Sequence, residues 1–119
     1  MSAEALLREE ICRFAKSLFD RGLTNGSSGN ISARLEDGLL VTPTGSSFGS
    51  LDPARLAKLD TAQRFVSGDK PTKELSLHSA FYDTRGTQSG AVVHLHSTHS
   101  VAVSMLPEID PESVFPPLT

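Results

Sequence analysis

The sequence predicts an α/β fold from three features. Apolar residues recur at helical spacing near the N-terminus, apolar and polar residues alternate in the segment that follows, and a β-branched run near the C-terminus precedes a further helical pattern. The length of 119 residues suits one domain or part of one, so we assign residues 1–119 to a single domain.

The first half of the chain is expected to form a helix and then a β-hairpin. The helix runs from about Ala3 to Arg21, and its apolar face consists of Leu7, Ile11, Phe14 and Leu18. Apolar and polar residues then alternate from Ile31 to Leu35, and Leu39–Val41 follows a turn, which predicts a hairpin.

The second half is expected to alternate between helices and strands. Asp52 caps a short helix, Arg64–Val66 is a strand, and a helix opens at Thr72 and closes at Gly86. The apolar face of that helix is expected to include Leu75, Leu77 and Phe81. Ala91–His96 reads as a strand, and a helix follows from about Ser97 to Leu106.

Composition excludes several classes of function. The net charge is -3 and there is no basic run, so we expect no nucleic-acid partner. No apolar stretch approaches the roughly 20 residues that cross a bilayer, and no secretory signal is present. Cys12 is the only cysteine, so no internal disulfide forms. We therefore expect a cytoplasmic protein without a membrane partner.

The C-terminus is unusual, because Pro116-Pro117-Leu118-Thr119 comes shortly after a helical pattern with no closing element. We expect that a longer domain has been cut or only partly represented. A short native tail is the alternative.

His94-Leu95-His96 is the sharpest chemical signal in the sequence. Side chains at positions i and i+2 of a strand leave the same face, so the two imidazoles are placed to bind one divalent ion. The alternative is a pair of partly buried histidines bonded to backbone carbonyls. The position just before a helix favours a metal site.

A catalytic zinc site commonly takes three protein ligands. Glu74, near the start of a helix, is the best carboxylate candidate, although an acid there is also favoured by the helix dipole alone. His78 lies four residues later on the same helical face and is expected to pack. His99 is expected at the start of the last helix, with its side chain pointing away from His94 and His96.

Two loops are rich in small polar residues, Gly26–Asn30 and Thr42–Gly45. Successive backbone N–H groups in such turns can bind anions. Neither loop is a Walker A motif or a dinucleotide fingerprint, and each could be an ordinary connection.

Five motifs occur in one order along the chain. They are Gly22-Leu23, Gly29-Asn30-Ile31-Ser32, Thr42-Pro43-Thr44-Gly45, Lys73-Glu74 and Val92-Val93-His94-Leu95-His96. This order and spacing resemble the class II aldolase/adducin family, which includes fuculose- and rhamnulose-phosphate aldolases and ribulose-phosphate 4-epimerase. The resemblance covers the chain from about Gly22 to Pro107.

The resemblance implies a role for each matching residue. The substrate phosphate would be held by Gly29, Asn30, Thr44, Gly45, Thr72 and Lys73. Glu74 would be the catalytic acid/base and a metal ligand, and His94 and His96 would bind a divalent metal, with zinc as the expected ion. A third histidine ligand is expected beyond Thr119. The aldolases carry a serine pair where this chain has Thr72-Lys73.

The resemblance also implies the architecture and the activity. The fold would be a three-layer α/β/α sandwich around a mainly antiparallel sheet, with residues 1–119 as its N-terminal portion, in a homotetramer. The segments Gly68–Glu74 and His94–His99 are most similar to 3-oxo-tetronate 4-phosphate decarboxylases. A small phosphorylated sugar acid would thus yield dihydroxyacetone phosphate and carbon dioxide. The alternatives are a sugar-phosphate aldolase or epimerase, and an adducin-like scaffold, against which the histidine pair argues.

Overall fold

The computed structural model describes residues 1–107 and 110–113. Residues 116–119, which carry the unusual C-terminal sequence, lie outside the described residues. Helix α1 (Ala3–Asp20) begins at Ser2, whose hydroxyl caps it by accepting a hydrogen bond from the Ala5 N–H at 3.1 Å. The helix has nearly the bounds that its apolar spacing predicts.

The strands form one five-stranded sheet in the order β4-β3-β2-β1-β5. Their bounds are β1 Asn30–Leu35, β2 Gly38–Val41, β3 Ala57–Leu59, β4 Phe65–Ser67 and β5 Ala91–His94. Every neighbouring pair is antiparallel, including the pair that places β5 beside β1. The expectation of a mainly antiparallel sheet is therefore confirmed.

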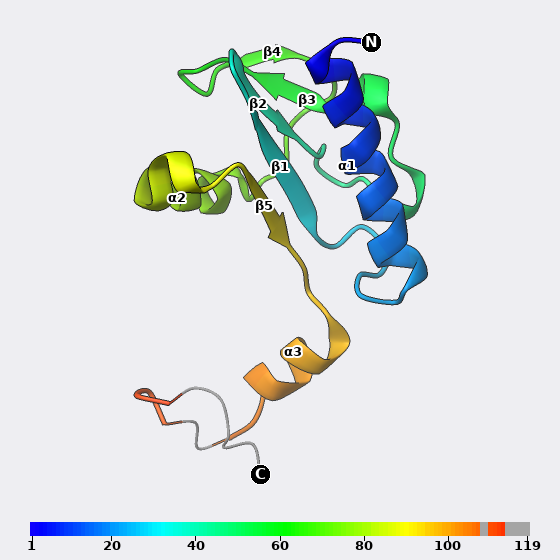
Figure 1. The fold of residues 1–119 in the computed structure, drawn as a ribbon. Helices are drawn as coiled ribbons and strands as arrows, with labels where there is room; N and C mark the ends of the chain where they lie inside the picture. The colour runs from blue at the N-terminus through cyan, green and yellow to red at the C-terminus, as the bar shows by residue number, and fades with distance from the viewer. Residues whose placement is uncertain (108–109, 114–119) are drawn as a thin grey trace.

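Two helices cover opposite faces of this sheet, as Figure 1 shows. The core beneath α1 contains Ile11, Ala15, Ile31, Ala33, Leu40, Phe48 and Leu56. The core beneath α2 (Leu75–Arg85) contains Leu39, Val41, Ala57, Leu59, Tyr82 and Val92. Successive strand residues point to opposite faces, so Leu40 of β2 enters the first core while Leu39 and Val41 enter the second. The three-layer α/β/α sandwich is confirmed.

Helix α2 begins later than the sequence predicts. The expected start at Thr72 is wrong, because the Thr72 N–H still donates to the Thr42 carbonyl at 3.1 Å and keeps this segment beside the sheet. The Thr72 hydroxyl then accepts a hydrogen bond from the Glu74 N–H at 3.3 Å. Glu74 consequently occupies the N-cap position and the helix starts at Leu75.

The buried face of α2 also differs from the expected one. Leu77 is 38% exposed and Phe81 is 47% exposed, so the prediction that both belong to the buried face is wrong. Leu75 does pack against the core. The residues that α2 buries are His78 and Tyr82, because polar side chains on β1 hydrogen-bond to them.

Three shorter segments complete the comparison with the sequence. Strand β3 was not expected, because its three residues, Ala57–Leu59, are too few to show alternation. Strand β5 ends at His94 rather than His96, since its neighbour β1 begins at Asn30, opposite His94. Helix α3 (Thr98–Ser104) lies within the expected range and extends away from the sheet (Figure 1). The 3₁₀ turns are Phe48–Ser50, Pro53–Arg55 and Gly86–Gln88.

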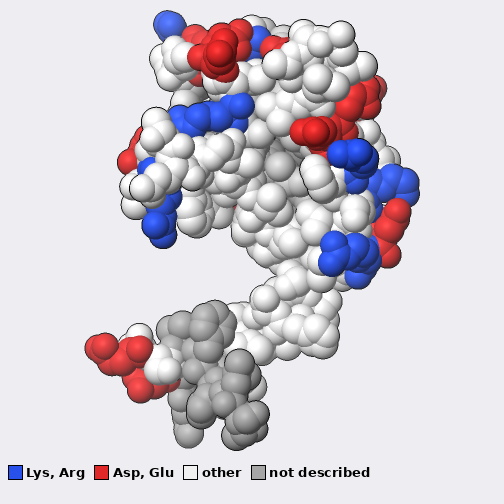
Figure 2. Space-filling model, viewed as in Figure 1, with Lys and Arg blue, Asp and Glu red and all other residues white. Residues whose placement is uncertain are grey.

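Charged side chains are spread over the sandwich rather than gathered by sign. Figure 2 shows both signs over the sheet and its helices on the face in view, and an uncharged stretch between them and the C-terminal end. Residues 94–107 contain no Lys, Arg, Asp or Glu. Among the described helices, none is both long and apolar enough to span a membrane.

Candidate active site

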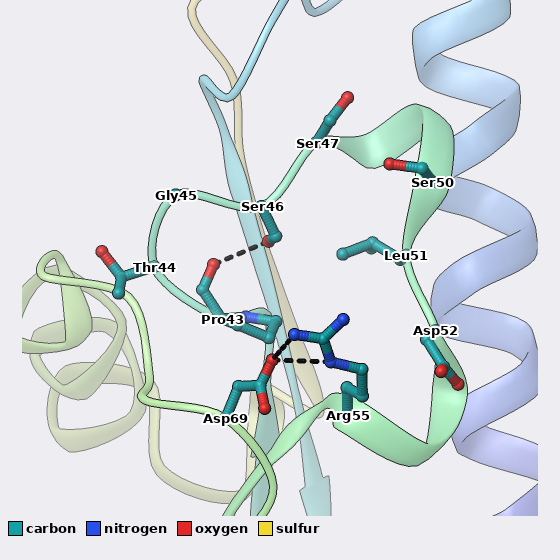
Figure 3. A pocket seen from close by; sticks show the side chains of 10 residues that line it. All are labelled: Pro43, Thr44, Gly45, Ser46, Ser47, Ser50, Leu51, Asp52, Arg55 and Asp69. Atoms are coloured by element: carbon teal, nitrogen blue, oxygen red, sulfur yellow. Dashed lines mark hydrogen bonds and ion pairs between the residues drawn. The ribbon is translucent and has the colours of Figure 1, made fainter.

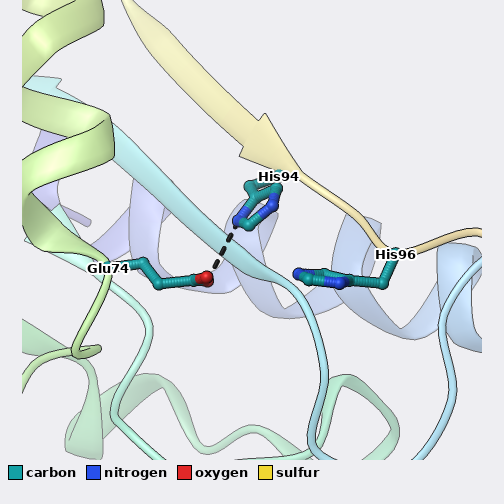
Figure 4. Close-up of side chains that lie close together, drawn as sticks. All are labelled: Glu74, His94 and His96. Atoms are coloured by element: carbon teal, nitrogen blue, oxygen red, sulfur yellow. Dashed lines mark ion pairs between the residues drawn. The ribbon is translucent and has the colours of Figure 1, made fainter. Parts of the chain in front are cut away.

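Glu74, His94 and His96 converge beside the end of strand β5, as Figure 4 shows. Each side chain offers one ligand atom, and the three atoms lie within 4.8 Å of one another. His94 Nδ1 is 3.0 Å from Glu74 Oε2, and the ring centroids of His94 and His96 are 4.6 Å apart. The two histidines therefore stay adjacent even though His96 lies beyond the strand.

This group of three fits a divalent metal ion in its donor chemistry. Two imidazoles and one carboxylate form a donor set that catalytic zinc sites use, with bonds of about 2.0–2.2 Å. Two ligand atoms on one tetrahedral ion with such bonds lie about 3.4 Å apart, so the group must contract to hold the ion. The structure brings together all three residues that the sequence singled out as metal ligands.

The Glu74 carboxylate is held by Asn30 on the neighbouring strand β1. Asn30 Nδ2 donates a hydrogen bond to Glu74 Oε2 at 2.5 Å. This bond is the main reason that the pKa of Glu74 is lowered; burial opposes it, and electrostatic interaction with the nearby His94 and His96 side chains adds to it. Glu74 is therefore ionised in the free site at neutral pH.

Asn30 itself is buried, with 4% of its surface exposed. Its Oδ1 faces His78 Nε2 in a short hydrogen bond and lies 3.2 Å from His94 Nδ1. Both ends of the amide are thus engaged by protein side chains. The structure places Asn30 within the Glu74–His94 group, whereas the family resemblance led us to expect it among the phosphate-binding residues.

A buried polar cluster behind Asn30 was not expected from the sequence as part of the site. Ser32 Oγ lies 2.6 Å from His78 Nδ1 and 2.7 Å from the Tyr82 hydroxyl. Burial lowers the pKa of His78 and raises the pKa of Tyr82. The available signal was the spacing of four between Glu74, His78 and Tyr82, which puts them on one face of a helix.

The expected phosphate-binding segments lie side by side around Thr42. Its N–H donates to the Ile31 carbonyl at 2.9 Å, its hydroxyl accepts from the Ile31 N–H at 3.1 Å, and its carbonyl accepts from Thr72. Gly29 lies one residue before β1, with a left-handed φ of +85°. The segments containing Gly29, Thr44 and Thr72 therefore meet at one end of the sheet.

Thr44 and Gly45 line a pocket of about 370 Å³, shown in Figure 3. The Thr44 N–H is occupied by the Lys70 carbonyl at 2.9 Å, but no hydrogen bond to the Thr44 hydroxyl occurs among the described residues. Across the pocket Arg55 pairs with Asp69 at 2.8 Å. The pocket thus offers small polar groups rather than an unpaired arginine.

Lys73 and His99 lie outside the converged groups. Lys73 is exposed, next to Glu74, and makes no ion pair within the described ranges. His99 is exposed on α3, as expected of a residue outside the group of Glu74, His94 and His96.

Residues 9–117 match the family described as Class II Aldolase and Adducin N-terminal domain. The chain belongs to this family. A relative from Cupriavidus necator, named 3-oxo-tetronate 4-phosphate decarboxylase, is 56% identical over 119 residues, which are 100% of this chain and 54% of that protein. An Escherichia coli relative, named L-fuculose phosphate aldolase, is 39% identical over 85 residues, 71% of this chain and 39% of its own.

The class II aldolase fold is also seen in a solved relative. The crystal structure of YgbL from Escherichia coli superimposes with a TM-score of 0.89 at 47% identity, covering 99% of this chain and 57% of YgbL. The chain thus spans about half the length of the relatives it matches. The family resemblance of the ordered motifs is confirmed.

Proposed function

We propose that the protein is a metal-dependent carbon–carbon lyase that decarboxylates a 3-oxo-tetronate 4-phosphate. The observation that carries the proposal is the convergence of Glu74, His94 and His96 beside segments rich in small polar residues. The relatives named 3-oxo-tetronate 4-phosphate decarboxylase, at 43–56% identity, support the choice of substrate.

In the resting site Glu74, His94 and His96 would hold the divalent ion, and the donor set favours zinc. When bound, such an ion supplies a Lewis acid that polarises the ketone oxygen of the substrate. The protein's own contribution is to hold the two imidazoles and the carboxylate in place, through the Asn30 amide and the β1–β5 pairing.

The proposed reaction breaks the bond between C1, the carboxylate carbon, and C2. The bonding electrons move to C2 and are delocalised into the adjacent C3 ketone, and C1 leaves as carbon dioxide. One proton is then added at C2, which gives dihydroxyacetone phosphate. Glu74 would deliver that proton. Because Asn30 lowers its pKa, Glu74 is ionised at rest and must first gain the proton from water.

We propose that the phosphate lies against Gly29, Thr44, Gly45 and Thr72, which would hold the reacting carbons near Glu74. Lys73 would face the same phosphate. A 3-oxo-tetronate phosphate carries a carboxylate besides its phosphate, so an additional ammonium favours it over a sugar phosphate whose only anionic group is the phosphate. Contact between Lys73 and the carboxylate itself would stabilise the ground state and slow decarboxylation, so we place the ammonium at the phosphate.

Aldol cleavage of a sugar phosphate is the second candidate. The L-fuculose phosphate aldolase at 39% identity favours it, since aldol cleavage also leaves electrons on the carbon beside a ketone. The adducin-like scaffold is disfavoured, because a non-catalytic chain has no need for three converging metal-ligand side chains.

The deciding experiment assays the full-length protein with 3-oxo-tetronate 4-phosphates and, separately, with fuculose 1-phosphate and rhamnulose 1-phosphate. Carbon dioxide and dihydroxyacetone phosphate from the first substrates, without aldehyde from the others, support the proposal. Efficient aldehyde release without decarboxylation would overturn it in favour of the aldolase. No turnover of any of these substrates by metal-loaded protein would contradict both enzyme candidates.

A further inference from the structure

Helix α2 and strand β1 face each other with matched polar spacing. Glu74, His78 and Tyr82 are separated by four residues each, about 6 Å along a helix. Asn30 and Ser32 are separated by two residues, about 6.6 Å along a strand. Because the two repeats nearly agree, polar side chains from the helix and the strand can interleave in a single row.

The hydrogen bonds follow this row without a gap. Ser32 Oγ bonds to the Tyr82 hydroxyl at 2.7 Å and to His78 Nδ1 at 2.6 Å. The amide of Asn30 then joins His78 Nε2 to Glu74 Oε2. Each strand side chain thus links two helix side chains, and the row ends at the Glu74 carboxylate.

The Glu74 carboxylate, at one end of the row, determines which group donates and which accepts in every hydrogen bond of the row. An ionised carboxylate only accepts hydrogen bonds, so Asn30 must turn its NH₂ towards Glu74 and its oxygen towards His78. His78 must then carry its proton on Nε2. His78 is 0% exposed and, within residues 1–107 and 110–113, no carboxylate bonds to its ring, so the neutral ring is favoured and Nδ1 accepts from Ser32. Ser32 in turn accepts from Tyr82.

We propose that His78 is a positioning residue: its Nε2–H fixes the orientation of the Asn30 amide, which in turn holds Glu74 for metal binding and proton transfer. Ser32 and Tyr82 keep the proton of His78 on Nε2. If the amide of Asn30 turned over, its oxygen would face the Glu74 carboxylate, and two acceptors would repel each other. The catalytic part of this role rests on the proposed function, whereas the hydrogen-bond order does not.

The first test reads the hydrogen-bond order directly in the full-length protein. Ring nitrogen chemical shifts of ¹⁵N-histidine-labelled protein report which nitrogen carries the proton, and the signal absent from a His78→Gln sample identifies His78. We expect a neutral ring protonated on Nε2. A proton on Nδ1, or a charged ring at neutral pH, would overturn the proposal whether or not the protein is a decarboxylase.

The second test asks whether His78 acts through Glu74, using zinc affinity measured by chelator competition. His78→Leu should weaken zinc binding about 10- to 100-fold, the usual effect of losing a residue that orients a ligand. In a Glu74→Gln background, His78→Leu should weaken zinc binding less than threefold. His78→Gln, whose amide can still donate to Asn30, should recover most of the loss. Asp83→Asn, at an exposed position of α2 outside the row, should change affinity less than threefold.

Equal losses in the two backgrounds would mean that His78 only supports the fold, and the positioning role would be wrong. Measuring kcat for His78→Leu with and without Glu74→Gln separates failure of the positioning role from failure of the proposed function. If the protein lacks decarboxylase activity but the zinc cycle is non-additive, the positioning role stands and the proposed function falls. Circular dichroism of each variant verifies that it is folded.

Discussion

Asn30 and Glu74 are 44 positions apart in the sequence, yet their side chains share a 2.5 Å hydrogen bond from Nδ2 to Oε2. This bond connects the first strand of the sheet to the N-cap of α2. It also joins the residue that the family resemblance assigned to phosphate with the residue that it assigned to acid–base chemistry. The predictions below begin from this contact.

Replacing Asn30 by alanine should raise the pKa of Glu74 towards its ordinary value of 4.5, because the hydrogen bond that lowers it is lost. An ionised Glu74 contributes stability above pH 4.5, and that contribution disappears as the pH falls through the lowered pKa of the folded state. Titration of ¹³C-glutamate-labelled, metal-free protein measures the shift. An unchanged Glu74 pKa in Asn30→Ala, or an equal rise in Asn25→Ala, would contradict this account.

Glu74→Gln should reduce turnover by about 10²–10⁴-fold, the usual contribution of acid–base catalysis. The fold should remain, since the Glu74 side chain makes no capping hydrogen bond to α2. In deuterium oxide the unaltered enzyme should place deuterium in one configuration at the new hydroxymethyl carbon, because one group delivers it. Near-normal turnover of the variant, or a racemic label from the unaltered enzyme, would exclude Glu74 as the proton donor.

Gly29→Ala should disturb the site more than Gly26→Ala does. Both glycines have left-handed φ angles, +85° and +58°, so each substitution costs about 1–2 kcal/mol of backbone strain. Only at Gly29 would the new methyl meet the His94 carbonyl at 3.1 Å, whereas nothing lies within 4 Å at Gly26. We expect weaker zinc binding for Gly29→Ala alone, measured by chelator competition. Equal losses of zinc affinity in Gly29→Ala and Gly26→Ala would mean that the contact with the His94 carbonyl is unimportant.

Thr44→Ala should weaken the binding of phosphorylated ligands. A hydrogen bond to a charged group contributes about 1.5–3 kcal/mol, which corresponds to roughly 10- to 150-fold in Kd. Unphosphorylated analogues should bind almost as before, and Thr61→Ala, an exposed residue of the β3–β4 turn, should affect neither ligand. Calorimetry on both ligand classes provides the comparison, and equal losses for the two classes would show that the loop is only structural.

The parts of the fold predicted from sequence are those with a repeating local pattern. The apolar spacing of α1 and the alternation of the β1–β2 hairpin gave bounds close to the observed ones. Strand β3, with three residues, had no pattern to detect. The face of α2 was misjudged because the apolar Leu77 and Phe81 stay exposed, while the polar His78 is buried by partners on β1.

The site residues divide in the same way. Adjacency between neighbours in sequence could be predicted, whereas contacts between distant segments could not. His94 and His96 are two residues apart, and their adjacency was predicted from strand geometry although β5 ends at His94. The approach of Glu74 depended on the family resemblance, because no local rule connects it to β5. The position of Asn30 between Glu74 and His78 could not be predicted, since it depends on contacts across 44 and 48 positions of the sequence.

The central claim is that Glu74, His94 and His96 form one metal site at which a carbon–carbon bond is broken. It is tested most directly by measuring metal content and carbon dioxide release on the same samples of full-length protein, purified without chelator. We expect about one divalent ion per chain in the unaltered protein. The His94→Ala, His96→Ala double variant should lose both the ion and the release of carbon dioxide from 3-oxo-tetronate 4-phosphate. Equal metal content and undiminished release in the double variant would contradict the account.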